Sequence, residues 1–142
     1  MIVRTAGETT SKTTVRIEHE PSGSVIETMA PRDNGGDGLL FSPTDLCATS
    51  LGACGSTIMN MYAQNSGIPL AGIRFTVDKE MLASPRRIGK LTVRYQLITD
   101  CSDADLEKLI AAGRTCPLRQ SIHPDIILDE SYERVAPGPA LG

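Results

Sequence analysis

The segment SPTDLCATSLGACGSTIMNMYA, residues 42–63, decides the fold of this 142-residue chain. Its start is typical of a helix: Ser42 suits the N-cap and Pro43 the first helical position. Asp45 stands three residues after the cap, where a carboxylate can reach back to the cap backbone and complete a capping box. We predict a helix of about six turns that ends near Asn65.

The centre of this helix is unusual because Gly52 and Gly55 stand on either side of Cys54. Each interior glycine costs a helix about 1 kcal/mol relative to alanine. Alanine, serine and threonine occupy most of the neighbouring positions, so the helix is small on nearly every side. This pattern predicts a central helix that other parts of the protein approach closely.

Composition limits the possible functions. The formal net charge is −3 and no basic run is present, which argues against nucleic acid as the main partner. No apolar run approaches the ~20 residues that a membrane span needs. The opening residues MIVRTAGETT lack the apolar segment of a signal peptide, so we expect a cytoplasmic protein. In that compartment four cysteines favour catalysis or metal binding over structural disulfides.

Two alternating runs near the N-terminus predict a β-hairpin. TTVRIEH (13–19) and SVIETMA (24–30) alternate apolar and polar residues, and EPSG (20–23) between them is a turn sequence. The glycine-rich stretch PRDNGGDG (31–38) predicts a loop before the long helix.

The rest of the chain predicts a second group of strands and a second helix. IRFTVDKEM (73–81) and GKLTVRYQLIT (89–99) are strand-like, and SDADLEKLIAAGRTC (102–116) is a helix that Ser102 could cap. PLRQSIHP (117–124) suits a short helix, and DIILDESYE (125–133) a last strand.

The predicted order is three strands, a long helix, two strands, a helix and a strand. Runs of strands separated by only two substantial helices favour an α+β fold over a doubly wound sheet. We expect a single domain over residues 1–133 and a flexible C-terminal tail over 134–142.

The four thiols differ in context. Cys47 and Cys54 lie on one helical face, about 10 Å apart by helical rise, so an intact helix cannot bridge them. Free cysteine is commonly a small buried hydrophobic residue, and we interpret Cys47 and Cys101 as structural.

Cys116 directly precedes Pro117, which opens the next predicted helical turn. A thiol at a helix N-terminus near Arg114 and Arg119 would have its thiolate form favoured. Cys116 is therefore a candidate reactive thiol.

Two other chemistries have less support. No Cys-x-x-Cys pair is present and His19 and His123 stand alone, so the usual zinc-ligand spacing is missing. A Cys-dependent hydrolase or transferase that uses His123 lacks an accompanying nucleophile elbow.

Two motifs in this order resemble the OsmC/Ohr family of organic hydroperoxide reductases. The first is SPTDLCATSLGACGS, which contains Cys54, and the second is CPLRQSIHPDIIL, which begins at Cys116. The Ser-x-His-Pro after the second cysteine is similar to the OsmC-like branch, and the resemblance covers nearly the whole chain. It implies an OsmC-like fold with antiparallel strands packed on two main helices. It also implies an intertwined homodimer whose active sites are shared between the subunits.

The resemblance further implies residue roles. Cys54 would be the peroxidatic thiol that reduces organic, fatty or alkyl hydroperoxides to alcohols, and Cys116 would resolve its sulfenic acid to a disulfide. Arg32 would be the cation beside Cys54. No metal, haem, flavin or other cofactor is needed, and an external dithiol, of the type carried by a lipoyl protein, would return the electrons. An apolar substrate pocket would draw on Leu39, Leu40, Phe41, Met59 and Met61.

One position departs from the family pattern. The family places a glutamate directly after the proline of the helix start to hold the active-site arginine, and here that residue is Thr44. Asp45 is one position further on, about 100° around the helix, and its expected role is the capping box, so the carboxylate that holds the arginine is either missing or comes from elsewhere, such as Asp33. A non-catalytic redox-sensing or small-ligand-binding dimer therefore remains the alternative function.

Overall fold

The computed structural model describes residues 1–138. The chain forms two compact units, Met1–Cys47 and the part from Ala48 onward. The prediction of a single domain over 1–133 remains a prediction.

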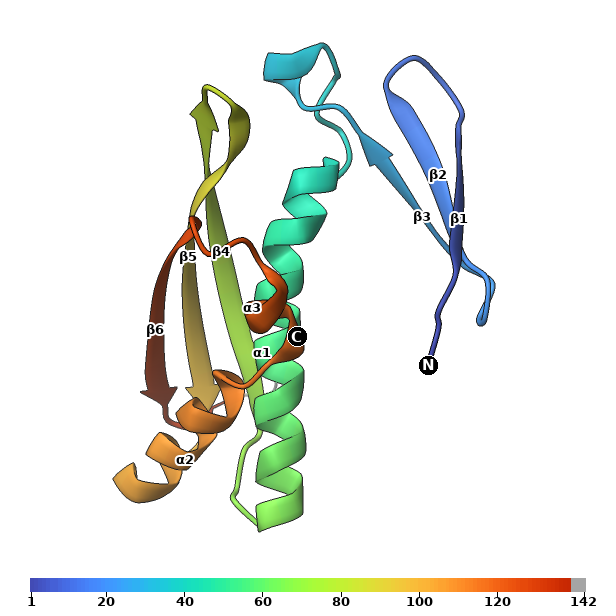
Figure 1. The fold of residues 1–142 in the computed structure, drawn as a ribbon. Coiled ribbons are helices and arrows are strands. Elements are labelled where there is room, and N and C mark those ends of the chain that lie inside the picture. The colour runs from blue at the N-terminus through green and yellow to red at the C-terminus, as the bar shows by residue number, and fades with distance from the viewer. Residues whose placement is uncertain (139–142) are drawn as a thin grey trace. The chain divides into compact units, whose positions relative to one another are not determined.

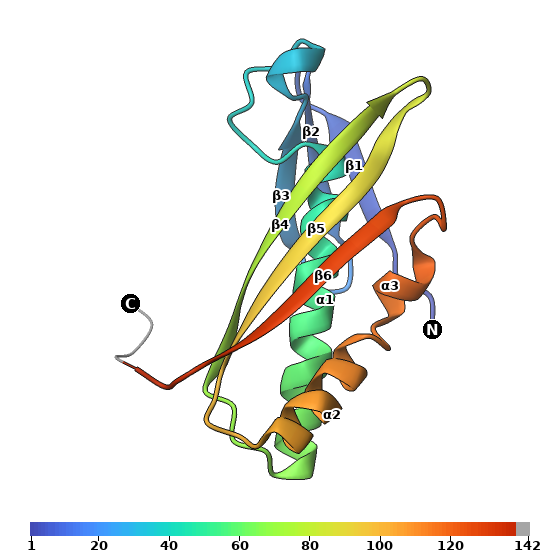
Figure 2. The same ribbon diagram turned by 90° about the vertical axis from the view of Figure 1, so that its left-hand side faces the viewer.

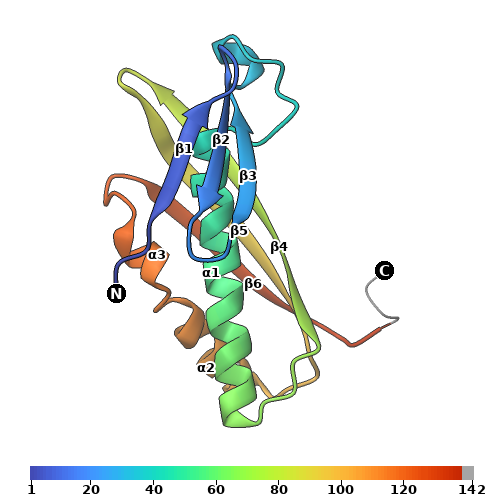
Figure 3. The ribbon, with the colours of Figure 1, turned by 90° about the vertical axis from the view of Figure 1, so that its right-hand side faces the viewer.

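The first unit contains an antiparallel three-stranded sheet of β1 (Thr5–Thr9), β2 (Thr14–His19) and β3 (Ser24–Met29). Figure 3 shows these strands side by side in the order β1-β2-β3. The predicted hairpin is confirmed, since β2 and β3 pair along their full length. Gly23 adopts φ 70°, the left-handed conformation that the turn requires and that glycine adopts without steric cost.

The loop after β3 contains a short 3₁₀ helix, η1 (Arg32–Asn34), and leads to the long helix α1 (Pro43–Ser66). The predicted capping box is present at the start of α1. The Ser42 N–H donates to Asp45 Oδ2 (2.9 Å), and the Asp45 N–H donates to Ser42 Oγ (3.1 Å). Both hydrogen bonds satisfy backbone donors that have no partner inside the helix.

The second unit contains the sheet of β4 (Gly72–Ala83), β5 (Arg86–Ile98) and β6 (Ile127–Val135), in the order β4-β5-β6. β4 and β5 form an antiparallel hairpin that is longer than predicted, with Ala83 already paired to Arg86.

The β5–β6 pair is parallel, whereas the family resemblance implied antiparallel strands. The helices α2 (Asp103–Gly113) and α3 (Pro117–Ser121) lie in the connection between the two strands. A parallel pair needs a crossover of a dozen or more residues, usually helical, and these helices supply it. Ser102 caps α2 as predicted, because its Oγ accepts from the Asp105 N–H (3.2 Å).

In the second unit α1 runs along one face of the sheet (Figures 1 and 2). Gly52 lies against the ring of Phe75, and Gly55 lies against the phenol of Tyr95. The prediction of a central helix that is closely approached is therefore confirmed for its glycines. The buried core is aliphatic apart from one tyrosine and two thiols, and comprises Ala48, Leu51, Met59, Ala63, Ile68, Ile88, Leu91, Val93, Tyr95, Leu97, Cys101, Leu109 and Cys116.

β6 continues to Val135, two residues into the segment predicted as a tail. Residues 139–142 of that predicted tail lie outside the described residues. Across residues 1–138, none of the helices is both long enough and apolar enough to cross a bilayer.

Candidate functional site

The fold brings two of the four cysteines together. Cys54 lies near the middle of α1, and Cys116 is the N-cap residue of α3. The Cys54 side chain lies close enough to raise the pKa of Cys116, and both are free thiols. Cys54 is partly exposed whereas Cys116 is 1% exposed, so reagents from solvent meet Cys54 first. We call Cys54 and Cys116 the thiol pair.

Two opposing effects act on the Cys116 thiol. Burial is the largest and raises its pKa, because it disfavours the charged thiolate. The Arg119 N–H donates to Cys116 Sγ (3.3 Å) and lowers the pKa of Cys116, while the neighbouring Cys54 thiol raises that pKa. The net direction is upward. We expected the helix N-terminus to favour the Cys116 thiolate. The Arg119 N–H does favour it, but burial has the larger effect and favours the protonated thiol.

An ion pair anchors the same short helix to β6. Arg119 Nε donates to Glu130 Oε1 (2.8 Å), and Glu130 is only 8% exposed. The Tyr132 hydroxyl donates to Glu130 Oε2 (3.1 Å), so each oxygen of this nearly buried carboxylate has a partner. Burial of a carboxylate is costly unless its oxygens are hydrogen-bonded, and both oxygens of Glu130 are.

Two stacked tyrosines complete the surroundings of the thiol pair. The rings of Tyr95 and Tyr132 are 5.0 Å apart and almost parallel, and the Arg114 guanidinium lies 5.6 Å from the Tyr132 ring centroid. Burial, followed by the charge of Glu130, raises the Tyr132 pKa to about 12. Burial also raises the Tyr95 pKa, with smaller contributions from neighbours that include both thiols. Both phenols are therefore neutral near pH 7.

Sequence reasoning missed Glu130, Tyr132 and Tyr95. Their signal was the period-two pattern of the strands, which places Glu130 and Tyr132 on one face of β6. The register that pairs Tyr95 with Tyr132 depends on the parallel β5–β6 pairing, which was not predicted.

Arg32 lies in the first unit, in η1, where its Nε donates to the Asp37 carbonyl oxygen (3.0 Å). Its side chain also lies against Gly38, which adopts φ 66°. The role of Arg32 beside Cys54 stays a prediction. Thr44, at the position of the family glutamate, has its hydroxyl 3.2 Å from Ser42 Oγ.

The other two cysteines have different surroundings. Cys101 is 6% exposed, its N–H donates to Thr99 Oγ1 (3.0 Å), and its carbonyl accepts from Arg134 (2.8 Å), as expected of a structural residue. Cys47 is exposed in this chain, in contrast to the small buried residue that we expected.

Of the five residues suggested for an apolar pocket, Met59 is fully buried and packs against Gly113 of α2, so it is a core residue. The other four are large exposed hydrophobic residues: Leu39, Leu40, Phe41 and Met61.

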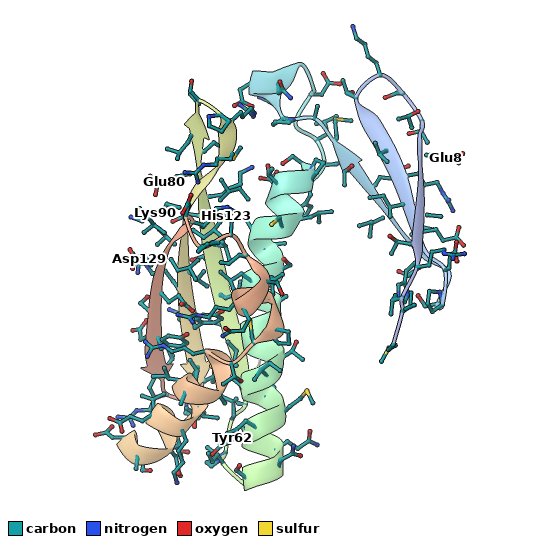
Figure 4. The ribbon with its side chains drawn as sticks, in the orientation of Figure 1. Glu8, Tyr62, Glu80, Lys90, His123 and Asp129 are labelled. Carbon is teal, nitrogen blue, oxygen red and sulfur yellow. The ribbon has the colours of Figure 1, made fainter. Side chains whose placement is uncertain are left out.

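His123 lies between α3 and β6 (Figure 4), and its side chain is 65% exposed. Its Nδ1 accepts from the Asp125 N–H (3.1 Å) and lies 3.8 Å from the Asp125 carboxylate. None of the interactions described for His123 involves a thiol. Within residues 1–138, no three His, Cys, Asp or Glu side chains are grouped to hold a metal ion.

Comparison with known proteins agrees with this architecture. The sequence model of the OsmC-like protein family matches residues 35–131. A Psychrobacter arcticus protein, provisionally described as an osmotic stress induced and detoxification response protein, has a crystal structure that superposes with a TM-score of 0.87 at 33% identity. The alignment covers 94% of this chain and 97% of that one.

Two more distant structures share the fold. The Legionella pneumophila organic hydroperoxide resistance protein OsmC aligns at 21% identity and a TM-score of 0.72, over 94% of this chain and 97% of that one. OhrB of Bacillus subtilis aligns at 15% identity and a TM-score of 0.65, over 94% and 98%. Comparison with curated protein sequences gave no significant match.

The fold is that of the OsmC/Ohr class of proteins, as the resemblance implied. The chain belongs to the OsmC-like protein family.

Proposed function

We propose that this protein is a cysteine-based peroxidase that reduces organic hydroperoxides to alcohols. The observation that carries the proposal is the thiol pair itself, a partly exposed Cys54 beside a buried Cys116 whose pKa it raises. An accessible thiol that meets the oxidant and a sheltered thiol beside it is the arrangement that two-step thiol oxidation needs.

The Cys54 thiol loses its proton, and the thiolate attacks the terminal peroxide oxygen. The O–O bond breaks, Cys54 becomes a sulfenic acid, and the departing alkoxide takes up a proton and leaves as the alcohol. Cys116 then attacks the Cys54 sulfur, the S–O bond breaks, and water leaves as the disulfide forms. An external dithiol, such as a lipoyl group on a partner protein, reduces the disulfide and is itself oxidised.

Arg32 is the proposed cation that favours the Cys54 thiolate and orients the peroxide. The protein would act in the cytoplasm as a homodimer with shared active sites, since the family relationship favours this assembly. The exposed apolar residues Leu39, Leu40 and Phe41 suit both a subunit interface and a pocket for greasy substrates.

The test is stopped-flow oxidation of the reduced protein by cumene hydroperoxide and by hydrogen peroxide, followed by non-reducing peptide mapping. We expect faster reaction with the organic peroxide and a disulfide between Cys54 and Cys116. Cys54→Ser should abolish the reaction, and Cys116→Ser should stop it at the sulfenic acid. Cys47→Ser is the matched control, because it removes a thiol from the same helix. Slow oxidation without preference between the two peroxides would contradict the proposal.

Thr44 favours a second candidate, a redox sensor or small-ligand-binding dimer. Its hydroxyl lies beside Ser42, and it offers no carboxylate to hold an arginine. A sensor would still form the Cys54–Cys116 disulfide. Peroxide would, however, oxidise its Cys54 thiol no faster than a free thiol of ordinary pKa.

A further inference from the structure

The pairing of Arg119 with Glu130 lies outside the roles proposed for Cys54, Cys116 and Arg32. We propose that Arg119 and Glu130 are positioning residues that hold Cys116 against Cys54 and thereby set how readily the two thiols form a disulfide. This inference rests on the proposed pairing of the thiols. It adds that the Arg119–Glu130 ion pair controls the second step, in which Cys116 forms the disulfide with Cys54.

Arg119 connects the ion pair to the Cys116 sulfur. The Arg119 side chain is held by Glu130 (2.8 Å), and the backbone N–H of the same residue donates to Cys116 Sγ (3.3 Å). The ion pair therefore fixes the residue that orients the thiol.

Besides the ion pair, the buried Cys116 at the N-cap and Leu118, which packs against the core, hold the short helix α3. It spans only Pro117–Ser121, and none of its residues is buried. Isolated helices of this length are not stable, so tertiary contacts determine the position of α3. The link from α3 to β6 is well protected, because the Glu130 carboxylate is 8% exposed and its second oxygen is held by Tyr132.

The reaction step shows why this anchoring matters. Cys116 loses its proton and attacks the Cys54 sulfur. The S–O bond of the sulfenic acid breaks, and the departing hydroxide takes up a proton as water. The Cys116 sulfur is oxidised and the Cys54 sulfur reduced to the disulfide level. A buried thiol in a fixed place gains rate by proximity, and a displacement of about 1 Å can cost about 100-fold.

The main test measures the thiol–disulfide equilibrium of the intact protein in glutathione buffers, without peroxide. Glu130→Gln keeps the size of the side chain and removes its charge. Alkylation and mass spectrometry give the fraction of protein with the Cys54–Cys116 disulfide. We expect Glu130→Gln to reach the same fraction as wild type only in a glutathione buffer that is about tenfold more oxidising. Glu130→Asp, which keeps the charge, should recover part of the difference.

The matched control is Glu18→Gln, which removes the carboxylate of another Arg–Glu pair, Arg16–Glu18 at 3.3 Å in the first unit. It should leave the equilibrium as in wild type. A purely structural Glu130 would lower the unfolding temperature of Glu130→Gln without moving the equilibrium, and that result would overturn the proposal. Should Glu130→Gln fail to fold, Arg119→Lys, which keeps the charge but loses the Nε donor, is measured instead with the same expected direction.

A second readout separates this inference from the proposed peroxidase. After peroxide addition, dimedone should trap more Cys54 sulfenic acid in Glu130→Gln than in wild type, because resolution is slower. If peroxide fails to oxidise Cys54 but the glutathione equilibrium still shifts in Glu130→Gln, the peroxidase fails and the positioning role stands. If peroxide oxidises Cys54 but the glutathione equilibrium is unchanged in Glu130→Gln, the positioning role fails and the proposed peroxidase stands.

Discussion

The phenol of Tyr95 occupies the space that a side chain at position 55 would need, so Gly55 of α1 and Tyr95 of β5 fit together as one contact. The Tyr95 hydroxyl also donates to the Leu51 carbonyl oxygen one turn earlier in α1 (3.3 Å). This contact lies beside Cys54 in sequence and joins the helix that carries the first thiol to the central strand of the sheet.

Gly55→Ala should destabilise the protein although alanine is the better helix former. A Cβ at this position would collide with the Tyr95 hydroxyl, and overpacking of this kind costs about 1–3 kcal/mol. The free energy of unfolding in urea measures the effect. Combining it with Tyr95→Phe, which removes the colliding oxygen, should recover part of the loss. An additive double variant would contradict this account.

Gly52→Ala should be destabilising for a parallel reason, since the added Cβ would meet the ring of Phe75. We expect a loss of about 1–3 kcal/mol in the free energy of unfolding. Phe75→Leu in the same chain should relieve the collision. Ala53→Ser, at an exposed position of the same turn, serves as the control and should change stability by less than about 0.5 kcal/mol.

Asp45→Ala should remove half of the capping box and cost about 1 kcal/mol of stability. Ser42→Ala removes the other half, and the two losses should not add, because the hydrogen bonds are reciprocal. Urea unfolding measures both. A loss of peroxide reactivity in folded Asp45→Ala would instead assign Asp45 to the site, as the carboxylate that Thr44 does not provide.

The raised pKa of Cys116 predicts a loss of stability of the reduced protein in alkaline solution. The folded state keeps the proton at a pH where the unfolded chain has already lost it. The stabilising contribution is thus complete below the ordinary thiol pKa of about 8.5 and declines as the pH rises toward the raised value. Urea unfolding between pH 7 and 10 should show this decline. Cys116→Ser, which does not titrate there, should flatten it, and identical pH dependence in the two proteins would contradict the prediction.

Phe41→Ser should weaken the proposed homodimer. Phe41 is 56% exposed and follows the exposed Leu39 and Leu40, which together form an apolar segment of the kind found at protein interfaces. Sedimentation should show more monomer in Phe41→Ser than in wild type at equal concentration. Ile127→Ser, a change at an exposed apolar residue of the other unit, is the control, and equal dissociation of both variants would speak against an interface at residues 39–41.

Elements whose causes are local could be predicted from the amino-acid sequence. The capping box at Ser42 and Asp45, the cap at Ser102 and the hairpin turn before β3 depend on residues close together in the chain, and each forms as its neighbours dictate. The glycines of α1 also indicated close packing, because each destabilises an isolated helix and contacts with a neighbouring element must compensate for that loss.

The surroundings of the thiols depend on contacts between segments that are far apart in the chain. The parallel β5–β6 pairing aligns Tyr95 with Tyr132 and brings Glu130 to Arg119, and strand pairing across a helical crossover is not encoded in any one segment. The Cys116 pKa shows the same division: its helix N-terminus was visible in the sequence, but burial, which depends on every neighbouring element, determines the direction of the shift.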